Sequence, residues 1–236
     1  MIMNKLSHFA IAIGRNKFYP LFCIICVTGA YIYTDPINDF NIRYAVSYAG
    51  AFLGLLCVIL LAKRKNLGNV LGMLAVIAEC CANFLGGNIG AGLPTFYYFG
   101  SHIYGILTWQ KNLDNNKSVK VRTLNENAFL YALIFLIAAA FFNIYLTNEI
   151  GAINTSYQLI TNCFIFGLGV VAQLLLMMRY AFNWYLWVLL NVLVISLNIY
   201  TDNIVIATQY LIYLFNAVYG ICEWKLSEQK EKEKKN

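Results

Sequence analysis

The segment NWYLWVLLNVLVISLNIY, residues 183–200, is as apolar as a membrane helix but carries two tryptophans and three asparagines. A helix of about 20 mostly apolar residues crosses the hydrocarbon core of a bilayer. At about 100° of rotation per residue, four side chains fall within an arc of roughly 60°: Trp184, Trp187, Asn191 and Asn198. The pattern predicts a helix with one aromatic and amide face, which either packs against other helices or holds a ligand.

The composition of the whole chain points to an integral membrane protein. Of 236 residues, 60% are hydrophobic and only 12% are charged, and the mean hydropathy is +0.62. Soluble domains have about a quarter charged residues. No short apolar run leads into a small-residue cleavage site, so we expect no removable signal peptide. The seven cysteines lie mostly inside apolar runs, and we expect them to pack rather than to form a redox site.

Eight stretches of the chain are candidates for membrane spans. They cover residues 18–34, 43–62, 66–85, 89–109, 126–147, 155–178, 183–200 and 203–224. A cytoplasmic N-terminus places every lysine and arginine except Arg43 on the cytoplasmic side, as the positive-inside rule requires. The sequence therefore predicts that both termini are cytoplasmic and that the net charge of +6 reflects topology and anionic lipid rather than nucleic-acid binding. The tail KLSEQKEKEKKN, residues 225–236, is expected to be solvated and disordered.

Two parts of the chain resemble each other. YGILTW at 104–109 corresponds to YGICEW at 219–224, an offset of 115, and residues 50–66 align with 167–183 at an offset of 117. Spans 2–4 are therefore predicted to repeat as spans 6–8, in parallel because span 5 links them. The expected units are an N-terminus with an extra helix (1–42), a first three-helix repeat (43–110), a loop with a linker helix (111–150), a second repeat (151–225) and a charged tail (226–236).

Polar stripes on the other spans extend the candidate site. At helical spacing, 89–109 carries a stripe through Tyr97, Ser101 and Tyr104. The further positions predicted to contact a substrate are Gln158, Asn162, Tyr213, Asn216, Glu79, Asn83 and Tyr104. Small and polar residues also hold membrane helices together. A mostly neutral lining of this kind suits a polar ligand with hydroxyl, amide or aromatic groups.

Glu79 is the only carboxylate well inside a predicted span. An intramembrane ionisable residue is costly and is usually functional. Three roles stay open for it: a structural hydrogen-bond network, contact with a cationic substrate, or coupling to a proton. His102 lies off the centre of its stripe, and we assign it no role.

Motifs for other chemistries are absent from the sequence. We find no GxxxxGK[ST], HExxH or GxSxG and no Cys/His cluster, so we expect no catalytic residue, no metal and no cofactor. Two other function classes stay open. One is a membrane scaffold whose stripes only pack, and the other is an intramembrane enzyme that uses Glu79 and His102.

Trp184-x-x-Trp187-x-x-x-Asn191 resembles the WxxWxxxN motif of the PnuC family of bacterial vitamin transporters. The resemblance implies an all-α, polytopic, SWEET-like fold with eight transmembrane helices: two parallel three-helix bundles, a linker helix and an extra N-terminal helix. It also implies nicotinamide riboside as the substrate, with thiamine or riboflavin as the alternatives that related carriers take.

The same resemblance implies how the site and the transport work. Trp184 and Trp187 would pack the nicotinamide ring or close the pocket, and Asn191 would hydrogen-bond to the ligand. Transport would be facilitated diffusion across the bacterial inner membrane, and a separate cytoplasmic riboside kinase would prevent return. Family members are similar in forming homotrimers.

Overall fold

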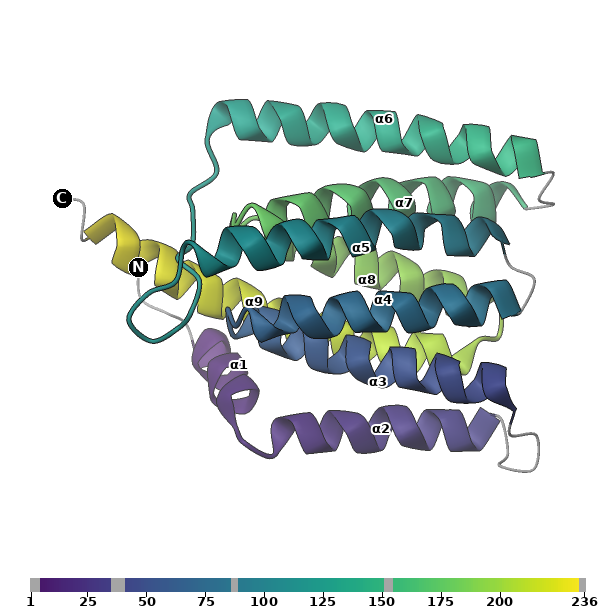
Figure 1. The fold of residues 1–236 in the computed structure, drawn as a ribbon, viewed down its shortest axis with the longest axis horizontal. Coiled ribbons are helices and arrows are strands. Elements are labelled where there is room, and N and C mark those ends of the chain that lie inside the picture. The colour runs from purple at the N-terminus through teal and green to yellow at the C-terminus, as the bar shows by residue number, and fades with distance from the viewer. Residues whose placement is uncertain (1–4, 35–40, 86–88, 151–154, 234–236) are drawn as a thin grey trace.

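The computed structural model describes residues 5–34, 41–85, 89–150 and 155–233, and its regular elements in these ranges are helices (Figure 1). The helices are α1 (Lys5–Arg15), α2 (Tyr19–Thr34), α3 (Ile42–Ala62), α4 (Leu67–Leu85), α5 (Ile89–Gln110), α6 (Glu126–Ile150), α7 (Ser156–Met177), α8 (Asn183–Tyr200) and α9 (Ile204–Glu233). The expectation of an all-helical protein is confirmed.

Six of these helices are long and apolar enough to cross a membrane by themselves: α3, α4, α6, α7, α8 and α9. Helices α1 and α2 pass the same criterion only as a pair, bent by 82° at the break between them. Helix α5 is long enough, but Pro94 and its glycines and polar side chains make it less apolar than the six. The chain is thus a multi-pass membrane protein, and the eight-span arrangement stays a prediction.

Six helices form a closed ring. Helix α4 packs between α3 and α5, α8 packs between α7 and α9, and the two groups meet where α3 touches α9 and where α5 touches α7. Helix α6 lies outside the ring against α7, and α2 lies outside it against α3 and α9 (Figure 1). Side chains on the inner faces of α4 and α8 therefore face each other across the interior of the ring.

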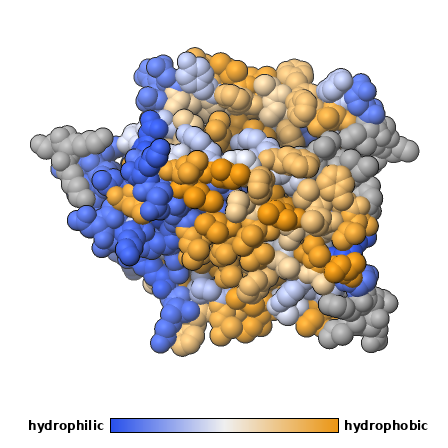
Figure 2. All heavy atoms as spheres, viewed as in Figure 1, coloured by the Kyte–Doolittle hydropathy of each residue, from blue (hydrophilic) through white to orange (hydrophobic). Residues whose placement is uncertain are grey.

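One end of the ring, which we call the basic end, carries the turns that follow α3 and α7. Hydrophilic residues gather there, at the left of Figure 2, while apolar residues cover the middle of the molecule. The two turns have the same geometry. Arg64 and Arg179 adopt positive φ angles of 59° and 70°. The N–H of each donates to the carbonyl three residues earlier, at 2.9 Å in both turns.

The connection between α5 and α6 crosses the basic end, and we call its residues 111–125 the strap. The N–H of Val119 donates to the Arg64 carbonyl at 2.9 Å, and the N–H of Arg122 donates to the Arg179 carbonyl at 2.8 Å. Both arginine side chains donate back to strap carbonyls, at 3.0 and 3.1 Å. Since each turn belongs to a different half of the ring, the strap ties the two halves together.

Charged side chains stabilise the strap and the turn at Arg64. The Asp114 carboxylate accepts hydrogen bonds from two strap N–H groups at 2.9 Å and lies 3.6 Å from the Arg64 guanidinium. Partial burial raises the pKa of Asp114, but these hydrogen bonds and the Arg64 charge outweigh it and hold this pKa below its ordinary value. Glu223 of α9 pairs with Arg15 at 2.9 Å and lies 3.8 Å from Arg64.

The charged tail differs from its prediction. Helix α9 continues through Glu233, so residues 225–233 are helical rather than disordered. Ser227 is buried, and Lys232 pairs with Glu228 one helical turn away at 3.3 Å. The prediction from charge density was wrong because contact with the rest of the protein and spacing of opposite charges by one turn both favour the helix.

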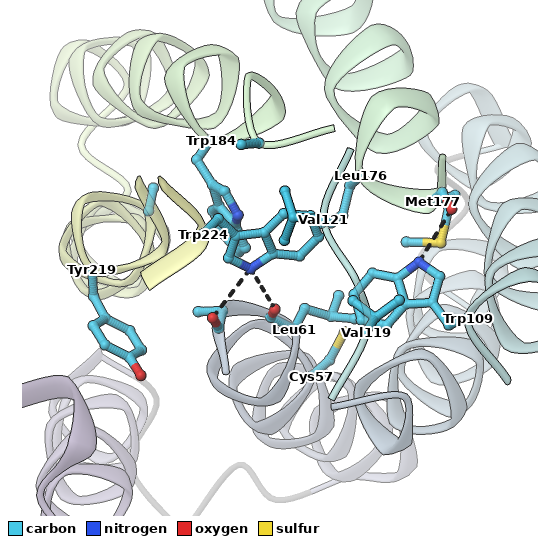
Figure 3. Packing of buried hydrophobic residues seen from close by; sticks show 13 residues of the cluster. Cys57, Leu61, Trp109, Val119, Val121, Leu176, Met177, Trp184, Tyr219 and Trp224 are labelled. Atoms are coloured by element: carbon cyan, nitrogen blue, oxygen red, sulfur yellow. Dashed lines mark hydrogen bonds between the residues drawn. The ribbon is translucent and has the colours of Figure 1, made fainter. Parts of the chain in front are cut away.

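Three tryptophans form the core of the basic end (Figure 3). The Trp109 indole N–H donates to the Met177 carbonyl at 3.1 Å, and the Trp224 N–H donates to the carbonyls of Leu61 and Ala62 at 3.2 Å. The last carbonyls of a helix lack intrahelical partners. Trp109 and Trp224 each lie in the third helix of one half and cap the first helix of the other half, so the two contacts are reciprocal.

Candidate functional site

The buried side of α8 is the side that the sequence pattern singles out. Asn191 is 2% exposed, and its amide makes no hydrogen bond with a described residue. Trp187 is half-buried, and its indole N–H is enclosed without a partner. Asn198 donates to the Val194 carbonyl of its own helix at 2.8 Å. An enclosed donor without a partner costs about 1–3 kcal/mol, so Trp187 and Asn191 are groups that a ligand could satisfy.

Trp184 has a different environment. It is 3% exposed, its ring lies against Gly220 of α9, and it meets Trp224 in a T-shaped contact with 5.8 Å between ring centroids. The close approach needs a residue without a side chain at position 220. Trp184 therefore closes the basic end beside Trp187 rather than facing the middle of the ring.

Across the ring, α4 presents Glu79 towards the interior. The buried residues of α4 include Gly72, Ala75 and Ala82, and at 100° per residue Glu79 lies at the centre of that arc. Its side chain is nevertheless exposed, so the neighbouring helices do not cover it. It makes no hydrogen bond or ion pair with a described side chain. Asn83 donates to the Glu79 backbone carbonyl at 3.0 Å, so its amide binds its own helix and not the Glu79 carboxylate.

Three tyrosines of neighbouring ring helices interact electrostatically with Glu79. Tyr98 of α5 and Tyr210 and Tyr213 of α9 all lie within electrostatic reach of its carboxylate. Gln209 donates to the Tyr213 hydroxyl at 2.7 Å, and the rings of Tyr210 and Tyr213 are 5.2 Å apart. Tyr210 and Trp187 pack against the same buried cluster, formed by Leu168, Leu190 and Val194. The acidic group on α4 and the polar face of α8 are thus joined through α9.

A buried polar network lies nearer the basic end. His102 of α5 pairs with the Asn69 amide oxygen at 3.2 Å, and Gln173 of α7 donates to Ser101 at 2.9 Å and lies 3.4 Å from His102. Gly72 and Gly105 leave room for these side chains. Because partners occupy these groups, the network fixes α4, α5 and α7 relative to one another and leaves little for a ligand.

Three predicted site residues have contacts apart from this interior group, and a fourth, Asn162, has no hydrogen bond. Gln158 forms a capping box with Thr155 at the start of α7. Asn216 donates to the Ile212 carbonyl at 3.1 Å and adjoins Tyr19. Tyr104 is 47% exposed and lies near Arg179 of the basic end. Asn162 is half-buried on α7 and makes no hydrogen bond with a described residue.

The capping role of Gln158 gives a direct test. Replacing Gln158 by alanine removes its acceptance of the Thr155 N–H, a 2.8 Å hydrogen bond. We expect a loss of about 0.5–1 kcal/mol in the free energy of unfolding. Ligand affinity should stay within about twofold. The hydrogen bond of the Gln158 side chain is to the Thr155 N–H at the start of α7, away from the interior. Thermal unfolding and titration of the same sample measure both quantities. A large loss of ligand affinity without a loss of stability would show that Gln158 contacts the ligand.

Sequence reasoning missed Tyr98 and Tyr210. The predicted stripe of α5 ran through Tyr97 and Ser101, but these face α7: the Tyr97 hydroxyl donates to the Val170 carbonyl at 2.6 Å. A helix that packs on both neighbours in a ring has polar groups on more than one side. The repeat offset could have found Tyr98, since it lies 115 residues before Tyr213.

The described residues hold no group of three or more His, Cys, Asp or Glu side chains that could bind a metal. Glu79 and Glu223, two acidic residues of ring helices, lie in different environments, and Glu223 is paired with arginines. The interior can thus offer aromatic faces, one carboxylate, an amide and an indole N–H. These groups recognise a polar, aromatic ligand of neutral or positive charge.

Comparison with known proteins agrees with this geometry. A family model described as nicotinamide mononucleotide transporter matches residues 44–226. The nicotinamide riboside transporter PnuC of Haemophilus influenzae is 25% identical over 178 residues, which cover 72% of this chain and 75% of that protein. The PnuC of Neisseria mucosa, also named a nicotinamide riboside transporter, is 24% identical over 197 residues, covering 78% and 73%.

A solved structure shares the fold. The crystal structure of the vitamin B3 transporter PnuC matches with a TM-score of 0.71 and 18% sequence identity, over 97% of this chain and 94% of that one. The family model covers more than half of the chain, including every helix of the ring. The chain therefore belongs to the nicotinamide mononucleotide transporter family, and the resemblance to PnuC that the Trp-x-x-Trp-x-x-x-Asn motif indicates is confirmed.

Proposed function

We propose that this protein carries nicotinamide riboside across the bacterial inner membrane by facilitated diffusion. The observation that carries the proposal is a set of polar groups on ring helices that lack partners among the described residues: the Trp187 N–H, the Asn191 amide and the Glu79 carboxylate. Both curated relatives bear the name of a riboside transporter. The riboside combines a cationic pyridinium ring with neutral sugar hydroxyls. The ring can bind the Glu79 carboxylate, and the hydroxyls can hydrogen-bond to Trp187 and Asn191.

The riboside fits better than the mononucleotide for which the family model is named. The mononucleotide adds a phosphate with a charge of about −1.5 to −2 at neutral pH. Among the described residues, the lysines and arginines lie at the basic end, near the helix ends or, for Arg43, at the start of α3. A phosphate would enter a low-dielectric interior without a cation and next to Glu79, which is strongly unfavourable.

In this proposal the two halves of the ring alternate access to the interior. The basic end is closed by the tryptophan core and the strap, so delivery on that side requires the two reciprocal indole contacts to loosen. Similar halves favour such a motion because the same contacts can open and close on either side. The supporting observation is the matched geometry of the turns at Arg64 and Arg179.

We place the basic end in the cytoplasm because Lys and Arg concentrate on the cytoplasmic side of membrane proteins. Phosphorylation by a separate cytoplasmic kinase would trap the riboside by adding the charge that the interior disfavours. The sequence contains no GxxxxGK[ST] loop for ATP, in agreement with movement down the ligand gradient. The exposed apolar faces of α2 and α6 are compatible with the homotrimer that the resemblance implies.

Calorimetric titration of the detergent-purified protein tests the proposal. We expect saturable binding of nicotinamide riboside and no measurable binding of the mononucleotide, thiamine or riboflavin. Binding of thiamine or riboflavin instead would keep a transporter but change its substrate. The absence of binding by all four would contradict the proposal and favour a scaffold, and chemical conversion of a bound ligand would favour an enzyme.

Two substitutions test the α8 face. Asn191→Ala and Trp187→Phe each remove one unmatched polar group, and we expect riboside affinity to fall about 5- to 100-fold for each, as for the loss of one buried hydrogen bond. Asn148→Ala is the control, because Asn148 is exposed near the end of α6. Asn148→Ala should bind the riboside like the wild type. If both α8 variants also bind it like the wild type, the site lies elsewhere.

A further inference from the structure

Glu79 lies at a depth where a charge needs a partner. It is the thirteenth residue of α4, about 18 Å along the helix axis from the basic end at 1.5 Å per residue. Gly50 of α3 packs against its backbone, 3.4 Å from the Glu79 nitrogen to the position of an added Cβ. The backbone is fixed by close packing, while the side chain stays exposed. The packing of the backbone thus positions the carboxylate, while no described side chain binds it.

The part of the chain that the structure describes supplies no cation to this carboxylate. Glu223, a buried acidic residue of α9, shows the contrast: Arg15 lies 2.9 Å from it and Arg64 lies 3.8 Å from it. The described residues show no ion pair at Glu79. Carboxylates inside membrane proteins pair with other groups or mark the path of a substrate or ion.

Tyrosines of α5 and α9 lie near the same group. An added Cβ at Gly54 of α3 would lie 3.0 Å from the Tyr213 hydroxyl and 4.0 Å from the Cβ of Ala75, one helical turn before Glu79. Tyr98, Tyr210 and Tyr213 come from two helices on the interior side, and all three interact electrostatically with Glu79. Tyr98 and Tyr213 are 115 residues apart, and each precedes the tryptophan of its own repeat, Trp109 or Trp224, by the same number of residues. The faces of aromatic rings carry negative potential and attract cations, most strongly where water is excluded. A carboxylate among such faces is a site for an organic cation.

We propose that Glu79, together with Tyr98, Tyr210 and Tyr213, forms the subsite that recognises the positive charge of the substrate's aromatic ring. This inference rests on the proposed function, since the pyridinium ring of nicotinamide riboside supplies the cation. The ring would lie between the α4 carboxylate and the tyrosines of α5 and α9. The sugar would then extend towards Asn191 and Trp187, to which Tyr210 is linked by packing.

The subsite also gives a reason for selection by charge. A neutral ring of the same shape gains dispersion contacts with the tyrosines but no attraction from the carboxylate. The reduced riboside, in which the ring is an uncharged 1,4-dihydropyridine, has almost the same size and the same amide and sugar groups. Comparison of these two ligands therefore isolates the charge of the ring from its shape.

The experiment is calorimetric titration of both ligands into the detergent-purified wild type, Glu79→Gln and Glu79→Asp. Glutamine keeps the shape and removes the charge, whereas aspartate keeps the charge. For the wild type we expect the oxidised riboside to bind at least about tenfold more tightly than the reduced form. For Glu79→Gln we expect this preference to fall below about threefold, through weaker binding of the oxidised form alone, and for Glu79→Asp we expect a preference to remain.

Glu149→Gln is the matched control, because this carboxylate lies exposed near the end of α6, outside the ring. An unchanged preference in Glu79→Gln would overturn the subsite, including the case in which Glu79 is already protonated. An equal loss for both ligands would also overturn it, because a structural role does not depend on ring charge. If the wild type binds neither riboside, the proposed function itself fails. If it binds both equally, only the charge subsite fails.

Discussion

Trp224→Ala is expected to lower the free energy of unfolding by about 3–5 kcal/mol, the usual cost of removing a fully buried aromatic side chain. Trp224 is 0% exposed and meets Trp109 and Trp184 with ring centroids 5.7 and 5.8 Å apart. Its N–H also donates to the carbonyls of Leu61 and Ala62 at the end of α3. The Leu61 carbonyl keeps the Arg64 N–H as a partner, but the Ala62 carbonyl would lose the indole N–H. The substitution thus removes packing, a cap and the contact between halves together.

Trp224→Phe and Trp109→Phe separate these contributions. Each keeps most of the ring but removes one indole N–H, so each should cost about 1–3 kcal/mol. The two should cost similar amounts, because Trp109 caps α7 as Trp224 caps α3. Unfolding in detergent, followed by circular dichroism in denaturant or on heating, measures the differences. Equal stability of Trp224→Ala and the wild type would show that the basic end is not held by this core.

Much of the fold follows from local features of the sequence. Apolar length and the distribution of Lys and Arg give the positions of the helices, because both depend on composition and not on tertiary contacts. The first predicted span, 18–34, coincides with α2 (Tyr19–Thr34). The sequence pattern did not indicate α1, whose sharp bend relative to α2 and packing on α9 depend on distant residues such as Tyr219.

The candidate site was harder to predict than the helices. Helical spacing placed Trp184, Trp187 and Asn191 on one arc, and the structure places them on the buried side of α8. Spacing within one helix cannot say which neighbour an arc faces. Trp184 turns to α9 and the strap, while Glu79 turns to tyrosines that come from other helices. These partners lie more than 100 residues away in some cases, and only the fold brings them together.

Gly220→Ala is expected to cost about 1–3 kcal/mol in the free energy of unfolding, as for overpacking in a full core. A Cβ at this position would lie 2.6 Å from two carbons of the Trp184 ring. The ring has no room to move, since Trp224 and the buried strap residues Val119 and Val121 enclose it. The helix preference for alanine over glycine, about 1 kcal/mol, offsets only part of this cost.

Two other glycines are the controls. Gly29 of α2 and Gly100 of α5 are also inside helices, and an added Cβ meets nothing within 4 Å at either position. Alanine there should leave the protein as stable as the wild type or stabilise it by about 0.5–1 kcal/mol. The same substitution is thus expected to change sign with position.

A double substitution identifies the clash itself. If Gly220→Ala destabilises because its methyl group pushes the Trp184 ring, then shortening that side chain should remove part of the penalty. In the Trp184→Leu background, Gly220→Ala should therefore cost less than in the wild type, with a coupling energy of about 0.5–3 kcal/mol between the two sites. Thermal unfolding of the four proteins gives this value. Additive effects would mean that the glycine serves another contact, and the close packing of α8 on α9 at the basic end would then need a different cause.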